Sequence, residues 1–141
     1  MNTHQIGVKA IIERADAILL IKRSERYKPV RYRDLAETWD LPGGRLEVGE
    51  GLEEGLEREV KEEVGLRIKN ITDVLEIKTV FRNKEEHIVR ITYICSAYDG
   101  EVQLSGEHTS ASWIRREELM KLQYKDDMLK DTLKKYIGRN Q

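Results

Sequence analysis

The stretch from Gly44 to Leu66 carries eight glutamates in 23 residues. Glutamates at this density repel one another when they lie four residues apart on a helix. A fold that contains this helix must therefore leave the acids in water or compensate their charge with a cation. The spacing of the acids indicates which of the two applies.

Helical periodicity divides the residues of a predicted helix over 52–66 between faces. The apolar face is predicted to enter the core and consists of Leu52, Leu56, Val60 and Val64. Measured from Glu59, Glu63 lies at about 40° and Glu62 at about 60° in the other direction, so these acids share one arc beside the apolar face. The far face is predicted to lie in water and consists of Glu54, Glu57, Arg58 and Lys61.

Partly buried carboxylates on one arc have raised pKa values unless a cation compensates their charge. A divalent metal does so, and ligand sets made only of oxygen suit hard cations such as Mg²⁺ or Mn²⁺. Periodicity leaves an alternative open, in which salt bridges to Lys61 and Arg67 satisfy the acids at the surface.

Strand patterns precede the helix. Two strands are predicted at 5–13 and 17–22, the second nearly continuous in apolar residues, as expected of a strand covered on both faces. Residues 24–38 have no periodicity and are predicted to form a loop. A short extended piece, Trp39 to Leu41, follows and ends at a proline and two glycines.

Strand patterns also follow the helix. The alternating runs 74–82 and 87–95 predict a hairpin, and 110–114 predicts a further short strand. From Glu117 onward the spacing of apolar residues predicts a terminal helix. Strands on both sides of one helix predict an α/β (α+β) domain over 1–141, with helices packed on both faces of a mixed sheet.

The composition fits this single domain, with 39% hydrophobic and 36% charged residues. The longest apolar runs are too short to cross a bilayer and no signal segment is evident, so a cytoplasmic protein without membrane contact is expected. The single cysteine, Cys95, excludes an intramolecular disulfide and a cysteine cluster for zinc. Its apolar neighbours predict that it is a buried small hydrophobe.

Charge is segregated along the chain. Residues 22–33 carry six Lys or Arg against one Glu, directly before the acidic stretch. A basic loop beside an acidic helix favours a site for an anion bridged by a metal, although solvated surface is the simpler alternative. Stable binding to nucleic acid is not expected, because the net charge is -1 and the basic stretch is short.

The acidic stretch also resembles a known motif. The pattern Gly44-x5-Glu50-x7-Arg58-Glu59-Val60-x-Glu62-Glu63-x-Gly65-Leu66 is similar at every constrained position to the Nudix box of the Nudix hydrolase family. The motif covers about a sixth of the chain. The order of the flanking strands and the terminal helix is similar to the α/β/α sandwich of that family, so the resemblance extends over the whole domain.

The resemblance implies an enzyme that cleaves nucleoside diphosphates linked to another moiety, using Mg²⁺ or Mn²⁺. It assigns the metal to Glu59, Glu62 and Glu63, with the backbone carbonyl of Gly43 as a further ligand. The remaining motif residues are given structural roles. Arg58 and Glu50 resemble the pair that braces the loop against the helix, and Gly44 and Gly65 are expected to form tight turns at the two ends of the unit.

Family members often supply one more acid from a later loop. Glu107 resembles that acid, and His108 beside it is an alternative, although a loop residue of either type is more often plain surface. The glutamate that takes the proton from the attacking water differs among family members. Glu59, Glu62 and Glu107 all remain candidates for the catalytic base.

Basic and aromatic residues before the motif are candidates for substrate contacts. Arg23, Arg26 and Lys28 are expected to bind the remaining phosphates. Tyr27, Tyr32 or Trp39 can stack on a base, while Trp39 and Trp113 are equally suited to core packing.

The resemblance restricts the substrate less strongly. Some subfamilies carry a proline for ADP-ribose, or a tyrosine for dinucleoside polyphosphates, about 15 to 18 residues beyond the box. Residues 81–84 read FRNK, which matches neither and favours a nucleoside triphosphate, ordinary or oxidised. A nucleotide sugar, another diphosphate, or binding without catalysis are the alternatives, and a homodimer is compatible with all of them.

Overall fold

The computed structural model describes residues 3–23, 38–81, 84–106 and 108–139, and the structural statements below refer to these residues. They form seven strands, two α-helices and one 3-10 helix. In chain order these are β1 (Thr3–Arg14), β2 (Ala17–Arg23), β3 (Trp39–Asp40), β4 (Gly43–Arg45), α1 (Leu52–Val64), β5 (Ile68–Phe81), β6 (Glu86–Ala97), β7 (His108–Arg115), η3 (Arg116–Lys121) and α2 (Asp127–Gly138). No helix in these ranges is long and apolar enough to span a membrane.

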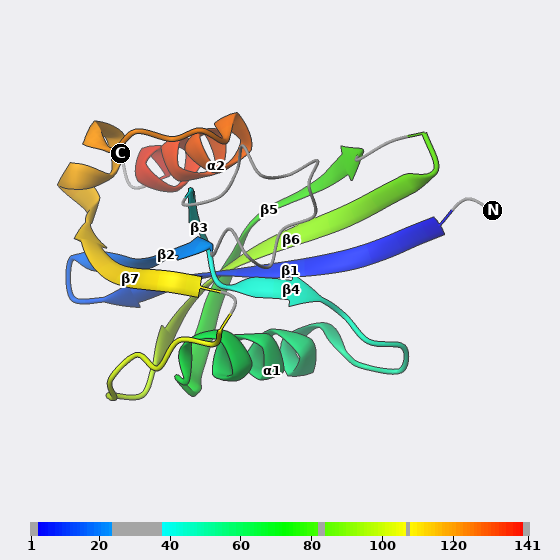
Figure 1. Cartoon of the computed structure of the whole chain (residues 1–141), viewed down its shortest axis with the longest axis horizontal. Helices are drawn as coiled ribbons and strands as arrows, with labels where there is room; N and C mark the ends of the chain where they lie inside the picture. The colour runs from blue at the N-terminus through cyan, green and yellow to red at the C-terminus, as the bar shows by residue number, and fades with distance from the viewer. Residues whose placement is uncertain (1–2, 24–37, 82–83, 107, 140–141) are drawn as a thin grey trace.

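The strands form one mixed sheet. Five of them follow the order β3-β2-β1-β6-β5, while β4 pairs with β1 and β7 pairs with β2. β1 and β6 run parallel, and the other pairs are antiparallel. Helix α1 covers one face of the sheet and α2 covers the other, as Figure 1 shows. The predicted α/β/α sandwich is therefore confirmed.

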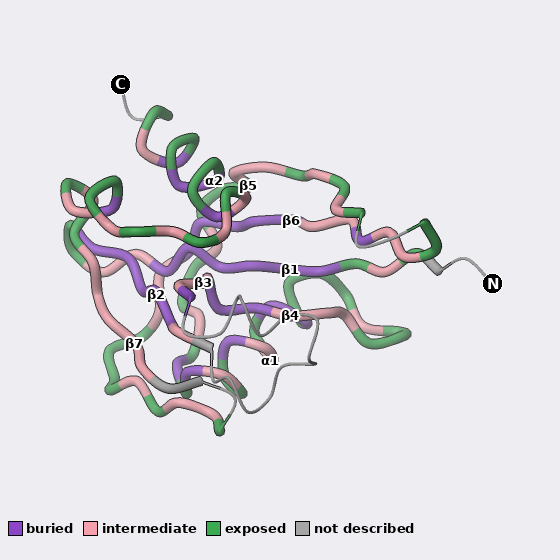
Figure 2. The backbone as a smooth tube through the Cα atoms, turned by 45° about the horizontal axis from the view of Figure 1, so that its top comes forward, coloured by how far each residue is buried: buried purple, intermediate pink, exposed green. Residues whose placement is uncertain are grey.

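The alternation of β1 explains why the core has two halves. Successive side chains of a strand point to opposite faces, so Val8, Ala10 and Ile12 pack toward α1 while Ile11 packs toward α2. Both central strands, β1 and β6, are buried over much of their length (Figure 2). The sheet thereby supplies a rigid platform on which α1 lies.

The first part of the chain follows the predictions closely. β1 and β2 cover the predicted strands, and the turn between them contains Ala15, whose φ of 53° is left-handed. Cys95 is fully buried, and burial raises the pKa of its thiol to about 12. The loop predicted at 24–38 lies, except for Thr38, outside the described residues.

Two predictions of secondary structure were wrong. The terminal helix does not run on from Glu117, because 122–126 separate η3 from α2 and the backbone of Leu122 is extended, with ψ 154°. The Asp126 side chain then accepts a hydrogen bond from Met128 N at 2.9 Å and starts α2 afresh. The hairpin strands are also longer than predicted, since residues 68–73, which do not alternate between apolar and polar, belong to β5.

Candidate active site

Helix α1 presents its buried face to the sheet much as periodicity predicts. The buried residues are Gly55, Leu56, Val60 and Val64. Leu52 was predicted to join them, and this was wrong, because it is the first residue of the helix and its side chain is exposed. At the other end Gly65 ends the helix in the left-handed conformation, φ 73°, as predicted.

Arg58 ties the loop before α1 to the helix. Its guanidinium donates from Nε to Glu50 Oε2 at 2.6 Å and from Nη2 to Glu50 Oε1 at 2.9 Å, and Nη2 also reaches the carbonyl of Arg45 at 3.1 Å. The Arg58 side chain holds the pKa of Glu50 at about 2. The brace implied by the resemblance is therefore present, whereas the helical-wheel prediction that Arg58 faces water was wrong, because its long side chain folds back over the loop.

The same guanidinium contacts two of the three predicted metal ligands. Arg58 Nη1 donates to Glu59 Oε1 at 3.0 Å and to Glu62 Oε2 at 3.1 Å. The alternative partners considered from sequence were Lys61 and Arg67, but the cation beside these acids is Arg58. The Glu62 side chain is 59% exposed, while that of Glu59 is only 16% exposed.

Glu63 occupies the most enclosed position of the three. Its Oε1 accepts a hydrogen bond from Gly43 N at 2.5 Å. Removal from water raises the pKa of the Glu63 carboxyl to about 7, although the charge of Lys9 and the Gly43 hydrogen bond act in the opposite direction. Burial likewise raises the pKa of Glu59, against the hydrogen bond from Arg58. Both carboxyls thus lie where a cation would be stabilised.

Gly43 and Gly44 bring the backbone close to these carboxyls. Both lie in β4, which pairs with β1, so the prediction that Gly44 forms a tight turn was wrong. Glycine at position 44 leaves room for the Glu59 carboxylate, since a Cβ there would lie 2.5 Å from both Cδ and Oε2 of Glu59. At Gly43 a Cβ would lie 2.0 Å from the carbonyl oxygen of Val8. The glycine pair therefore allows β4 to lie between β1 and the acidic face of α1.

Sequence reasoning missed Lys9. This residue of β1 is buried, and its Nζ lies 3.1 Å from Asp40 Oδ2 and 3.2 Å from the carbonyl oxygen of Leu41. Burial raises the pKa of Glu59 and of Glu63, and the charge of Lys9 partly opposes this rise, so Lys9 belongs to the electrostatics of the site. A lysine inside the apolar run VKAII was the signal that indicated a buried, partnered charge.

The donors of this site fit a hard divalent cation, because they are carboxylate oxygens and two of the carboxyl groups carry raised pKa values. In the arrangement of the described side chains no three acidic, histidine or cysteine groups converge on a single point. Instead, Arg58 donates hydrogen bonds to Glu59 and Glu62. Glu63 accepts its hydrogen bond from the backbone N–H of Gly43. The three acids lie along one face of α1 without converging, and Arg58 supplies a positive charge beside Glu59 and Glu62.

Several predicted site residues lie outside the described part of the chain. These are Arg26, Lys28 and Glu107, together with Tyr27 and Tyr32. Arg23 closes β2, and the backbone of His108 begins β7, beside Arg23 in the register of the two strands. Trp39 and Trp113 are partly buried against the two halves of the core. Arg23 and Trp39, which flank the predicted loop 24–38, thus belong to the adjacent strands β2 and β3.

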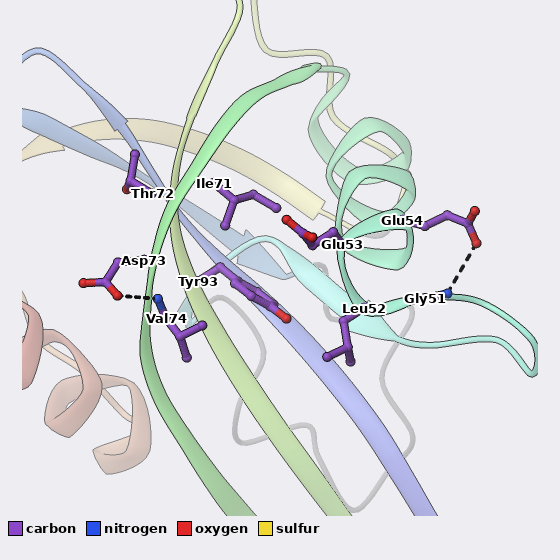
Figure 3. Close-up of a pocket in the computed structure, with 9 residues that line it drawn as sticks. All are labelled: Gly51, Leu52, Glu53, Glu54, Ile71, Thr72, Asp73, Val74 and Tyr93. Carbon is purple, nitrogen blue, oxygen red and sulfur yellow. Dashed lines mark hydrogen bonds between the residues drawn. The ribbon is translucent and has the colours of Figure 1, made fainter.

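A hollow of about 650 Å³ lies between the start of α1 and the strands β5 and β6 (Figure 3). Its lining comes from the first turn of the helix and from β5 and β6, namely Gly51, Leu52, Glu53, Glu54, Ile71, Thr72, Asp73, Val74 and Tyr93. Glu59, Glu62 and Glu63 are not among them. The hollow is therefore separate from the acidic face of α1.

The raised pKa of Glu63 predicts a pH dependence of stability in metal-free protein. A carboxyl with a folded pKa of about 7 and an ordinary value of 4.5 stabilises the fold at low pH, and this contribution is lost as the pH rises through 7. We expect urea unfolding with a chelator present to show a free energy of unfolding lower by about 2 kcal/mol at about pH 8 than at about pH 5.5. Glu63→Gln should remove this difference, and an unchanged difference would contradict the assignment.

Gly44→Ala tests the space beside Glu59. The added methyl meets the end of a flexible side chain, so we expect β4 to persist while the Glu59 carboxylate is displaced. Divalent-metal affinity, measured by calorimetry, should fall at least about tenfold with little change in the melting temperature. Gly51→Ala is the control, because nothing lies within 4 Å of its Cβ position. Equal metal affinity in the two variants would mean that Glu59 is not a ligand.

Comparison with known proteins identifies the family and the fold of this chain. The family model of the NUDIX domain matches residues 3–136. The MutT protein of Methanosarcina mazei Go1 has a similar structure, with a TM-score of 0.83 and 28% sequence identity, covering 99% of this chain and 97% of that one.

Two curated relatives carry different names. One, 30% identical over 132 residues, is an ADP-ribose pyrophosphatase of Methanocaldococcus jannaschii, and the match covers 92% of this chain and 73% of that protein. The other, 34% identical over 91 residues, is the nucleoside triphosphatase NudI of Escherichia coli, with 58% of this chain and 64% of that protein covered. The match over residues 3–136, together with the braced acidic helix and its glycine pair, shows that this chain belongs to the Nudix hydrolase family.

Proposed function

We propose that the protein is a divalent-metal-dependent pyrophosphohydrolase whose substrate is a nucleoside triphosphate, ordinary or oxidised. The observation that carries this proposal is the pair of enclosed carboxyls, Glu59 and Glu63, held against the backbone of Gly43 and Gly44. Glu59, Glu62 and Glu63 would hold Mg²⁺ or Mn²⁺, with the Gly43 carbonyl as a further ligand. When bound, such an ion neutralises phosphate oxygens and lowers the pKa of a coordinated water.

The residues of the chain then have separate tasks. A glutamate, one of Glu59, Glu62 and Glu107, accepts the proton as the water oxygen attacks phosphorus. The phosphoanhydride P–O bond breaks, and the leaving group departs on the side opposite the attacking oxygen, so that a nucleoside triphosphate and water give a nucleoside monophosphate and pyrophosphate. Arg58 keeps the loop against α1 through its two hydrogen bonds to Glu50, which fixes the position of the acidic face.

The choice of a triphosphate rests on residues 81–84 and on the relatives. The sequence FRNK lacks the proline and the tyrosine that mark the ADP-ribose and dinucleoside polyphosphate subfamilies. The similarity to a nucleoside triphosphatase supports this choice, while the similarity to an ADP-ribose pyrophosphatase makes ADP-ribose the second candidate.

A hydrolysis screen tests both the proposed reaction and the proposed substrate. Nucleoside triphosphates, their oxidised forms, nucleotide sugars, ADP-ribose and dinucleotides should each be assayed with Mg²⁺ and with Mn²⁺. We expect the highest kcat/KM for a triphosphate and no turnover after chelation. A preference for ADP-ribose would replace the substrate and keep the chemistry, whereas turnover of no phosphoanhydride would favour binding without catalysis.

The basic loop should contribute to substrate binding. If Arg23 and Arg26 bind phosphates equally in the ground state and the transition state, Arg23→Ala and Arg26→Ala raise KM more than they lower kcat. Loss of one charged hydrogen bond predicts an increase in KM of about tenfold. Steady-state kinetics measure this, with Lys125→Ala, an exposed lysine outside the predicted site, as the control. Unchanged KM in both arginine variants would reduce the loop to solvated surface.

A further inference from the structure

Strand β5 forms one edge of the sheet. In the order β3-β2-β1-β6-β5 it has a neighbour only on the β6 side among the described strands. An unpaired edge offers a row of backbone N–H and C=O groups to any other strand, and natural proteins usually block such edges with bulges, charges or prolines. The two halves of β5 differ in this respect.

The first half of β5 is interrupted and the second half is regular. The register with β6 shifts between Ile68 and Asn70, between Ile71 and Asp73, and between Val74 and Glu76. From there to Phe81 each residue of β5 pairs in turn with one residue of β6, without a shift. Residues 76–81 are therefore a straight and continuous edge.

The regular half also carries apolar side chains into water. Across the sheet, Val8 of β1 is fully buried, Ile91 of β6 is buried, and Ile77 of β5 is 64% exposed. This row lies on the α1 face, since Val8 and Ile91 belong to the core under α1. The row thus begins in the core and ends in solvent, as the change from buried to exposed between the central strands and β5 indicates in Figure 2.

A second apolar side chain lies four residues further along the same face. Phe81 is 66% exposed, and its ring contacts that of His87, with a centroid distance of 4.5 Å. Ile77, Thr79 and Phe81 point the same way because they alternate along a regular strand. An unpaired strand edge with exposed apolar side chains is the kind of surface to which another strand can pair.

We propose that residues 77–81 of β5 pair antiparallel with the same residues of a second copy of this chain, around a two-fold axis at Thr79. This register sets each Ile77 opposite Phe81 of the other copy and Thr79 opposite itself, and these apolar and Thr–Thr cross-strand pairs are favourable. The axis is perpendicular to the sheet, so both α1 helices lie on one face of a continuous sheet.

Charge and regularity select this register over its neighbours. An axis at Lys78 would place two lysines directly opposite each other, which is unfavourable. An axis at Ile77 would bring the shifted residues 74–76 into the interface and interrupt the ladder. An axis at Thr79 uses only 77–81 and sets Lys78 opposite Val80, so no like charges meet.

The proposed interface is small and independent of the chemistry of α1. Five paired residues on each copy predict a weak dimer, with a dissociation constant in the range of about 1–100 µM. Ile77 lines neither the acidic face of α1 nor the hollow beside its first turn. Association therefore does not rest on the proposed function, and hydrolysis per copy should be the same in monomer and dimer.

Sedimentation velocity over a concentration series that brackets about 1–100 µM tests association. We expect the wild-type chain to dimerise and Ile77→Lys to remain monomeric, because the substitution replaces the apolar pair of Ile77 with Phe81 of the other copy by a charge facing an aromatic ring, twice in each dimer. Met120→Lys is the matched control, since it replaces an exposed apolar side chain on η3 and should leave the dimer intact. Thermal melting and turnover should be the same for the wild type and for Ile77→Lys.

Disulfide formation tests the register. Directly opposed residues of an antiparallel pair have Cα atoms about 4.5 or 5.5 Å apart, within the span of a disulfide. Thr79→Cys should therefore cross-link two copies under oxidised glutathione, while Asn70→Cys, exposed in the shifted half of β5, should not. The proposal is overturned by a chain that stays monomeric, by a dimer that survives Ile77→Lys, or by a dimer that Thr79→Cys fails to cross-link.

Discussion

Glu63→Gln is expected to lower kcat at saturating Mg²⁺ by at least about a hundredfold while the protein remains folded. The substitution keeps the size of the side chain and nearly keeps its helix propensity, so α1 should form as before. It removes the carboxylate that lies closest to the backbone of Gly43, and with it the charge that would hold the cation. Steady-state turnover of the best substrate, with circular dichroism to confirm folding, measures the effect.

The stability of Glu63→Gln distinguishes a carboxylate that binds a metal from one that is only part of an acidic surface. Because burial raises the pKa of Glu63, an uncharged residue there should make the metal-free protein more stable at about pH 8, although it is far less active. Glu57→Gln is the control, since Glu57 is exposed on the other side of the same helix and should keep full activity. Equal activity of the two variants would mean that the glutamates are surface residues.

Gly43→Ala is expected to lower the free energy of unfolding by at least about 3 kcal/mol. Its Cβ would lie 2.0 Å from the carbonyl oxygen of Val8 and 2.8 Å from Cα of Lys9. Both are backbone atoms of β1, so neither can turn aside as a side chain would. The backbone of Gly43 also has a φ of 149°, which L side chains rarely adopt.

Chemical denaturation compares this variant with Gly138→Ala. At Gly138 nothing lies within 4 Å of the Cβ position, so the change in unfolding free energy should stay within about 1 kcal/mol. The contrast with Gly44→Ala is also informative, because there the added methyl meets a flexible side chain. A stable and active Gly43→Ala would show that β4 can move away from β1 without loss of the site.

The sequence determined the elements whose pattern is local. The apolar spacing of α1 and the alternation of the strands follow from periodicity, which each segment carries in itself. Gly65 at the end of α1 follows from the same kind of signal, since a left-handed C-cap favours glycine. The one-arc arrangement of Glu59, Glu62 and Glu63 is also a property of the helix alone.

Longer-range features were not determined by these patterns. The break at 122–126 arises because Asp126 caps a new helix, and apolar spacing continues across it. Residues 68–73 show no alternation because they belong to an edge strand that shifts register against β6. The register shift is decided by the pairing with β6, a strand that 68–73 meet only in the folded sheet.

The site shows the same division. The sequence placed three acids on one helix and a glycine pair before them, because motif and helical spacing are local. Only the tertiary structure decided that Arg58 reaches the carbonyl of Arg45, that Gly44 leaves space for Glu59, and that Lys9 lies buried beside Asp40. These facts depend on how β4 lies between β1 and α1, and desolvation and close contact arise only when segments distant in sequence are packed together.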